Sequence, residues 1–346
     1  MVVSTPEQLA AALAPVVKYH PRERYFLDDA EDYFERTKPH TSADGEKARV
    51  MKEGLALENY TYPEPKETVP AFFHVAMNPD WENHYYIVYY LFYPYNGPKR
   101  VFGLVPTGAH TADIETITVK VRTSDNQVLE YMMTNHGDNV AYALDNGVEE
   151  GATAPRNALL GEAPGRVGPE DAPLVGLDEE GHPVVYTSLN GHGLYNEPGS
   201  YIRLGGAGND VTADGGPSTR VRPIKLPLDS PLLLWKGRFG DDGVNGYYKR
   251  RNPEDEKPAI PRHARVPGAL ASLAYGLYAL LPLAAYGLAR WLGGLGALLS
   301  AGVAAVVFVA QFYVLKAALT IIFPLVGAPK PDPDDWWRWL LPLRLD

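Results

Sequence analysis

An unbroken run of aromatic and apolar side chains over Tyr85–Tyr93 is the feature that most constrains the fold. It has the length of a β-strand and is followed at once by the turn sequence Pro94–Pro98. A strand without polar side chains on either face must be covered on both, so we predict a central strand. Further strands are predicted at Ile114–Val121, Val128–Thr134 and Pro183–Leu189. Short strands separated by turns indicate a mainly β fold, a β-sandwich.

Two segments beside these strands have a different character. Ser4–Val17 is predicted to form a short opening helix, capped by Ser4 or Thr5 before Pro6. Asp145–Pro183 is rich in Gly, Pro, Ala and Glu and shows no periodicity. We predict a long loop there.

Asp113 and Glu115 continue the apolar face of the strand that ends at Val121. Alternate side chains of a strand share a face, so both carboxylates lie in the row of Ile117 and Val119. The opposite row, at the even positions of 114–120, is mostly polar and is predicted to face water. Burying a carboxylate is costly unless it is paired or protonated, so a cation, a basic partner or a proton-transfer role is expected here.

Histidines at three separate positions complete a candidate metal site. His110, His136 and His192 join Asp113 and Glu115 if the loops of the sandwich meet at one end. Imidazole with carboxylate suits Zn²⁺ or Mn²⁺, whereas carboxylates with water suit Mg²⁺ or Ca²⁺. The alternative is a metal-free network, in which His110 or His192 satisfies the carboxylates.

Composition excludes several functions. The net charge of the chain is −10, and residues 1–265 alone carry −11, which argues against a nucleic-acid partner. The chain has no cysteine, so disulfides, thiolate zinc sites and thiol nucleophiles are ruled out. It also lacks a serine in a nucleophile elbow and a Gly-rich phosphate loop. We therefore expect no nucleotide or redox cofactor, and the balance is against an enzyme.

The C-terminal part of the chain is much more apolar than the rest. Pro267–Leu292 and Ala297–Val326 are nearly continuous apolar runs, each longer than the roughly 20 residues of a membrane-spanning helix. We predict a helical hydrophobic hairpin over 259–328, inserted in a membrane, and an aromatic and basic tail over 329–346. Basic residues at both outer ends place the N-terminal domain, 1–258, on the cytoplasmic side. The residues predicted at the membrane interface are Arg265, Arg290, Lys316, Trp336, Trp337 and Trp339. Alternatives are a wedge in one leaflet, or a hairpin buried in a large complex.

Six segments stand in an order that resembles a known family. They are Leu13–Phe26, Tyr90–Pro98, His110–Glu115, Asn135–Gly137, His182–Tyr195 and Trp235–Gly240. Together they resemble the vacuolar protein sorting-associated protein 62 family over roughly residues 13–245. Ile114 departs from the tryptophan usual in that family, and the hairpin is not part of its pattern. His110–Glu115 alone also resembles the heptapeptide that surrounds a divalent metal in necrosis- and ethylene-inducing-like proteins.

These observations predict a membrane-anchored, non-enzymatic β-sandwich that binds or scaffolds, with a divalent-metal site. The resemblance implies a role in membrane trafficking. Membrane lipids and either protein partners or a second copy of the chain are the expected partners. One alternative is a membrane-tethered, metal-dependent hydrolase with Glu115 or Asp113 as general base. Another is an accessory subunit of a large membrane complex.

Overall fold

The computed structural model describes residues 5–41, 45–52, 64–78, 81, 83–101, 105–135, 138–146, 166–170, 172–201, 210–240, 243, 246–247, 265–266, 282–291, 299–304 and 306–307. Among these residues the named helices are α1 (Pro6–Ala12), α2 (Ala30–Arg36) and α3 (Pro231–Leu234). The strands are β1 (Val16–Lys18), β2 (Thr37–Thr41), β3 (Lys47–Met51), β4 (Thr68–Ala76), β5 (His84–Asn96), β6 (Lys99–Val101), β7 (Val105–Thr107), β8 (His110–Arg122), β9 (Val128–Asn135), β10 (Asp138–Asp145), β11 (Arg166–Val167), β12 (Leu174–Val175), β13 (Val184–Thr187), β14 (Leu194–Tyr195), β15 (Gly199–Tyr201), β16 (Asp210–Thr212), β17 (Ser218–Lys225), β18 (Arg238–Phe239) and β19 (Arg265–Val266).

The chain forms two compact units. The first consists of Met1–Pro98, Gly108–Pro198 and Thr212–Ile260, and the second of Lys99–Thr107, Gly199–Val211 and Pro261–Asp346. An 11-stranded sheet with the order β11-β10-β9-β8-β5-β4-β17-β1-β13-β14 builds the first unit, with β12 paired to β10. In the second unit β6 pairs with β7, and β15 pairs with β19. The prediction of a mainly β fold is confirmed.

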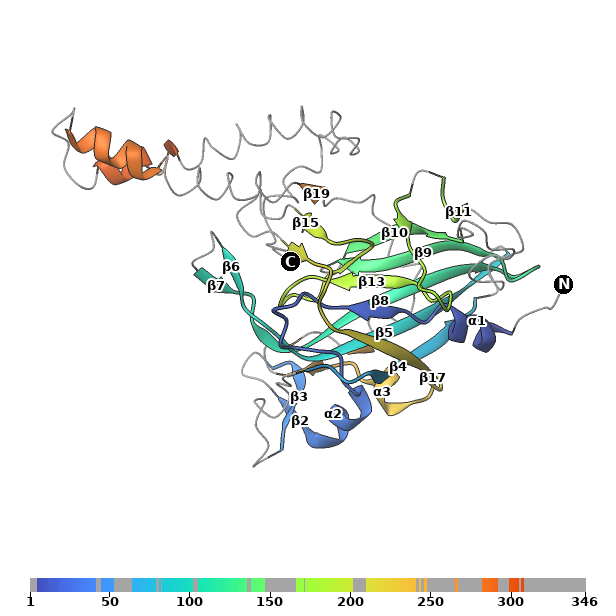
Figure 1. Cartoon of the computed structure of the whole chain (residues 1–346). Helices are drawn as coiled ribbons and strands as arrows, with labels where there is room; N and C mark the ends of the chain where they lie inside the picture. The colour runs from blue at the N-terminus through green and yellow to red at the C-terminus, as the bar shows by residue number, and fades with distance from the viewer. Residues whose placement is uncertain are drawn as a thin grey trace. The chain divides into compact units, whose positions relative to one another are not determined.

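The large sheet encloses one core between its own two halves. The inward side chains of β5, β8 and β9 pack in the same apolar cluster as those of β1, β13 and β17. These two groups of strands therefore face each other, and one curled sheet supplies both layers of the sandwich. Tyr195 of β14 donates a hydrogen bond to Asn135 of β9 over 3.1 Å, which links the end of the sheet back to its middle. Figure 1 shows the long strands β4, β5, β8 and β9 running side by side.

A second core covers the other face of the same strands. Tyr33 of α2 and Phe239 of β18 pack against Phe92, with ring centroids 4.9 and 5.8 Å apart. Tyr85–Tyr93 is buried on both faces, as predicted, with its odd residues in the first core and its even residues in the second. The prediction that the even face of β8 meets water is wrong: Ile114 is fully buried. The cause is the covering layer of α2, α3 and β18, which comes from distant sequence.

The two flanking segments differ in part from expectation. α1 is shorter than predicted, and Thr5 caps it in a reciprocal pair with Gln8. In the predicted loop 145–183, β11 and β12 both pair with β10, so this segment extends the sheet where the structure describes it. Loops that add short strands carry too little periodicity to be recognised from sequence.

The C-terminal hairpin requires a correction. Residues 282–291 and 299–304 are helical, and both stretches are short of the roughly 20 residues that a span needs. In the part of the chain that the structure describes, no helix is long and apolar enough to cross a membrane. The predicted membrane localisation, with the N-terminal domain on the cytoplasmic side, is therefore wrong. Apolar composition alone could not establish a continuous helix. The rest of the predicted hairpin and the tail 329–346 lie outside the described residues.

Candidate functional site

Asp113 and Glu115 lie at the end of the first core. The two residues are 6% and 3% exposed, and Ile117, which follows in the same row, is fully buried in the core. The predicted inward register of the odd face of β8 is therefore confirmed. Across the strand pair, Tyr93 faces Asp113 and Leu91 faces Glu115. The sheet thus holds two carboxylates against a wall of apolar and aromatic side chains.

His192 is held against Asp113 by a tight loop after β13. Its imidazole is fully buried and stacks on the ring of Tyr93, with centroids 3.8 Å apart and planes 6° from parallel. Nδ1 lies 3.3 Å from Asp113 Oδ2, and Nε2 lies 3.0 Å from the carbonyl oxygen of Tyr25. His192 and Asn190 both have positive φ, of 54° and 64°. Such strain in residues other than glycine is maintained only where the surroundings fix it.

The two hydrogen bonds of His192 determine where its protons lie. A carbonyl oxygen can only accept, so Nε2 carries a proton. A hydrogen bond between Nδ1 and the Asp113 carboxyl group then needs a proton of its own, on the imidazole or on Asp113. The imidazole of His192 therefore positions the carboxyl group of Asp113 through this hydrogen bond.

Glu23 anchors the loops that hold His192. Its Oε1 accepts the backbone N–H groups of Arg24 (2.9 Å) and Tyr25 (3.0 Å), and its Oε2 accepts that of Asn190 (2.6 Å). The side chain is buried. Our sequence reasoning missed this residue, although it stands in the first segment of the family resemblance. Its role depends on residues 25 and 190 meeting in space, which no local pattern indicates.

Glu115 and Tyr93 complete the set that we call the inner cluster, with Glu23, Asp113 and His192. Thr134 of β9 donates its hydroxyl proton to Glu115 Oε2 and accepts the backbone N–H of Thr116 over 2.6 Å. The buried hydroxyl of Tyr93 has no hydrogen-bond partner among the described residues. Burial, with the charges of Glu115, Asp113 and Glu23, raises the pKa of Tyr93 well above its usual value. The phenol therefore stays protonated beside the carboxylates.

The structure describes four of the five predicted metal-site residues. Asp113 and His192 come together, and Glu115 shares their face of the sheet. His110 Nδ1 instead lies 2.8 Å from the carbonyl oxygen of Ala112, where the backbone φ is 55°. His136 is outside the described residues. Among the residues described, no group of three or more His, Asp or Glu is arranged to hold a metal ion.

The residues predicted at a membrane interface do not gather in the described structure. Arg290 lies in the helical stretch 282–291, and Arg265 lies in β19. Lys316, Trp336, Trp337 and Trp339 are outside the described residues.

Comparison with known proteins does not assign a family. No family model and no curated protein matches the chain. A solved structure described as "Toxin fold for microbial attack and plant defense" shares 9% identity, with a TM-score of 0.37, over 74% of this chain and 93% of that one. "NLPPya in complex with mannosamine" shares 8%, with a TM-score of 0.34, over 75% and 94%. Necrosis and Ethylene inducing Protein 2, from the causal agent of cocoa's Witches Broom disease, shares 12%, with a TM-score of 0.27, over 63% and 74%.

These findings overturn the resemblance to the vacuolar protein sorting-associated protein 62 family. The similar structures are toxin-fold and necrosis- and ethylene-inducing proteins, and none represents that sorting family. Short segments in a common order were insufficient, because strand-and-turn motifs with His and Asp recur in unrelated sandwiches. A role in trafficking loses its support with the family. The identities and TM-scores are low, so we take no ligand or activity from these structures.

Proposed function

We propose that the chain is a non-enzymatic binding protein whose β-sandwich takes a divalent cation at the inner cluster, beside Asp113 and Glu115. The supporting observation is the Tyr93 hydroxyl, which is fully buried, lacks a hydrogen-bond partner among the described residues and lies near both carboxylates. Leaving a polar oxygen unsatisfied in a core costs about 1–3 kcal/mol. A cation or an ordered water bound to the carboxylates would give that oxygen a partner.

The donor chemistry favours a hard ion. Both ring nitrogens of His192 are already engaged, by Asp113 and by the carbonyl oxygen of Tyr25. His192 would therefore not bind the ion itself but would orient Asp113, as partners of metal ligands often do. Carboxylate oxygens supplemented by water suit Ca²⁺ or Mg²⁺ better than Zn²⁺. His110 and His136 remain proposed as additional ligands.

We propose binding and not hydrolysis because the two carboxyl groups that could act as a general base are enclosed in the protein. A general base must reach the proton it removes from a substrate. Asp113 and Glu115 are buried and engaged by His192 and Thr134. A cation with unfilled positions at the edge of this cluster would instead bind hydroxyl or phosphate oxygens. We propose that the ligand is such a polar molecule, a free sugar or a lipid headgroup.

The test uses the full-length protein after treatment with a chelator. Adding Ca²⁺ or Mg²⁺ should raise the melting temperature by several degrees, because an ion that binds only the native state stabilises it. Elemental analysis should find about one ion per chain. Asp113→Asn and Glu115→Gln should abolish both effects. The matched control is Asp125→Asn, which removes a carboxylate from the exposed turn between β8 and β9.

Three results would distinguish the alternatives. If none of Ca²⁺, Mg²⁺, Zn²⁺ and Mn²⁺ changes the melting temperature of the parent protein, the cation site is refuted. If the Asp125→Asn control loses the effect as well, the ion binds to general negative charge. Saturable binding of a free sugar would separate that ligand from a headgroup recognised only in vesicles.

A further inference from the structure

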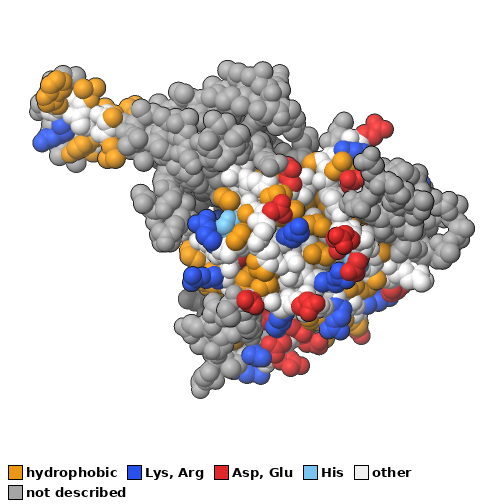
Figure 2. Space-filling view, in the orientation of Figure 1, with side chains coloured by type: hydrophobic (Ala, Val, Ile, Leu, Met, Phe, Trp, Pro, Cys, Tyr) orange, Lys and Arg blue, Asp and Glu red, His pale blue; other side chains and the backbone are white. Residues whose placement is uncertain are grey.

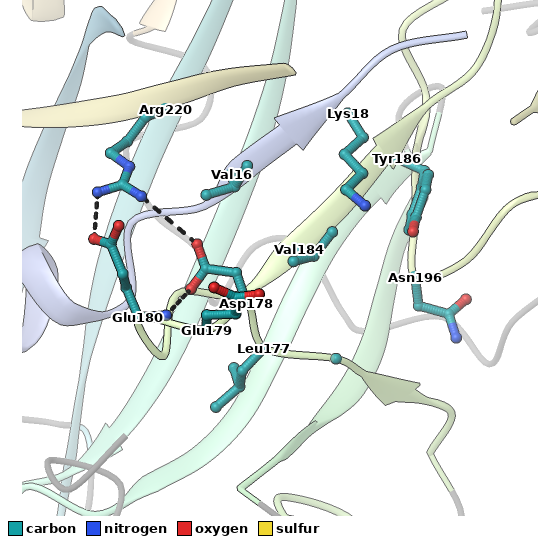
Figure 3. A pocket seen from close by; sticks show the side chains of 11 residues that line it. Val16, Lys18, Leu177, Asp178, Glu179, Glu180, Val184, Tyr186, Asn196 and Arg220 are labelled. Carbon is teal, nitrogen blue, oxygen red and sulfur yellow. Dashed lines mark hydrogen bonds and ion pairs between the residues drawn. The ribbon is translucent and has the colours of Figure 1, made fainter. Parts of the chain in front are cut away.

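A hollow of about 570 Å³ lies on the first unit, over the outward face of β17, β1 and β13. Val17 and Val185 point into the first core, so their neighbours Val16 and Val184 point away from it. Val16 is paired with Val184 on one side and with Arg220 on the other. The two half-buried valines make an apolar floor that no further layer of the described structure covers. We call this site the outer hollow (Figure 3).

One wall of the outer hollow is acidic and rigidly held. Asp178 Oδ1 accepts the backbone N–H groups of Glu180 (3.0 Å) and His182 (2.8 Å), which fixes the turn before β13. Arg220 bonds Glu180 with one guanidinium nitrogen, and another lies 3.8 Å from Asp178 Oδ2. Figure 3 shows these contacts closing one side, with Glu179 beside them. The turn therefore presents its carboxylates at a fixed place.

The opposite wall carries a cation that is already neutralised. Lys18 Nζ lies 3.7 Å from Asp214 Oδ1, and Tyr186 donates its hydroxyl to the same oxygen over 2.9 Å. Asn196 lines this side as well. Burial, the hydrogen bond to Asp214 and the charge of Glu197 raise the pKa of Tyr186 to about 12. The tyrosine is therefore uncharged at neutral pH.

Negative charge exceeds positive charge around the hollow. Among the lining side chains, the two cations Lys18 and Arg220 stand with the three carboxylates of Asp178, Glu179 and Glu180. Asp214 does not line the hollow and pairs with Lys18. Both cations are paired, whereas Glu179 is exposed and forms no ion pair with another described residue. Figure 2 shows acidic and basic side chains interspersed with apolar patches on the face turned to the viewer.

We propose that the outer hollow binds a small organic cation with an aliphatic chain, of the polyamine class. An ammonium group would pair with Glu179, and the methylene groups would lie on Val16 and Val184. The volume falls within the roughly 300–1,000 Å³ typical of small-ligand sites. A charge-assisted hydrogen bond gives such a ligand its orientation, and burial of its methylenes adds affinity. An anionic ligand is disfavoured by the excess of carboxylates. This site is independent of the cation proposed at the inner cluster.

The test is isothermal titration of the full-length protein with spermidine at low ionic strength. We expect saturable binding with one ligand per chain, and none with hexane-1,6-diol, which has a similar apolar stem without charge. Glu179→Gln should weaken spermidine binding about tenfold. Glu170→Gln is the matched control, because Glu170 is exposed and does not line the hollow. Absence of saturable binding, or an equal loss in the control, would overturn the proposal.

The apolar floor is tested separately. Val184→Phe should fill the floor and abolish spermidine binding, while the melting temperature shows whether the sheet still folds. Val184→Thr, which keeps the shape, should retain most of the binding if the protein folds normally. Undiminished binding by a folded Val184→Phe protein would show that the ligand does not lie on β13.

Discussion

The inner cluster and the outer hollow contain similar side chains but differ in burial. Each places carboxylates beside a basic partner: His192 with Asp113 in one, and Arg220 with Asp178 and Glu180 in the other. The inner carboxylates are enclosed by the sheet, whereas Glu180 is exposed. A buried charge has lost its water, so loss of any of its contacts lowers the free energy of unfolding strongly. Water screens an exposed ion pair, so its loss has little effect. The inner cluster should therefore contribute to stability, and the outer hollow should be able to exchange partners.

The largest expected effect is at Glu23. Glu23→Ala removes the acceptor of three partly buried backbone N–H groups and should cost about 3 kcal/mol of unfolding free energy, because all three donors lose their partner at once. Glu180→Ala, in the outer hollow, should leave the urea midpoint almost unchanged. Urea unfolding of both variants measures the contrast. Equal midpoints for the two would remove the distinction between the sites.

A second comparison concerns the two faces of β8. Glu115→Ala should destabilise by about 3 kcal/mol, since it opens a cavity at a buried position and removes the acceptor of the Thr134 hydroxyl. Thr116→Val should change stability by less than about 1 kcal/mol, because the Thr116 hydroxyl has no partner among the described residues. Both side chains are buried, and Thr116→Val keeps the side-chain volume that Glu115→Ala removes. A costly Thr116→Val would mean that the second core depends on that hydroxyl.

Features of the fold that depend on neighbouring residues could be predicted from the sequence, whereas features that depend on residues distant in the chain could not. The alternation of β8 is local, so the inward placement of Asp113 and Glu115 could be inferred. The covering of Ile114 depends on Tyr33 and Phe239, which are distant in sequence. The link between Glu23 and Asn190 likewise exists only after the sheet curls. Apolar runs predicted the C-terminal hairpin from composition alone, without evidence for continuous helix.

The smallest expected effect is a pH dependence at the border of the inner cluster. Burial, with the charge of Arg22, lowers the pKa of His20, and its Nδ1 accepts the backbone N–H of Arg22 over 3.0 Å. The unfolded chain, with an ordinary histidine pKa near 6.5, therefore binds more protons than the native protein in the window just below that pH. Stability should fall as the pH drops through this window and recover above it. His20→Asn, which keeps an acceptor, should flatten that part of the melting-temperature profile between about pH 7 and pH 5. His84→Asn is the control, because it removes a half-buried histidine that stacks on Trp81 instead. An unchanged profile in His20→Asn would place the acid sensitivity of the protein at another group.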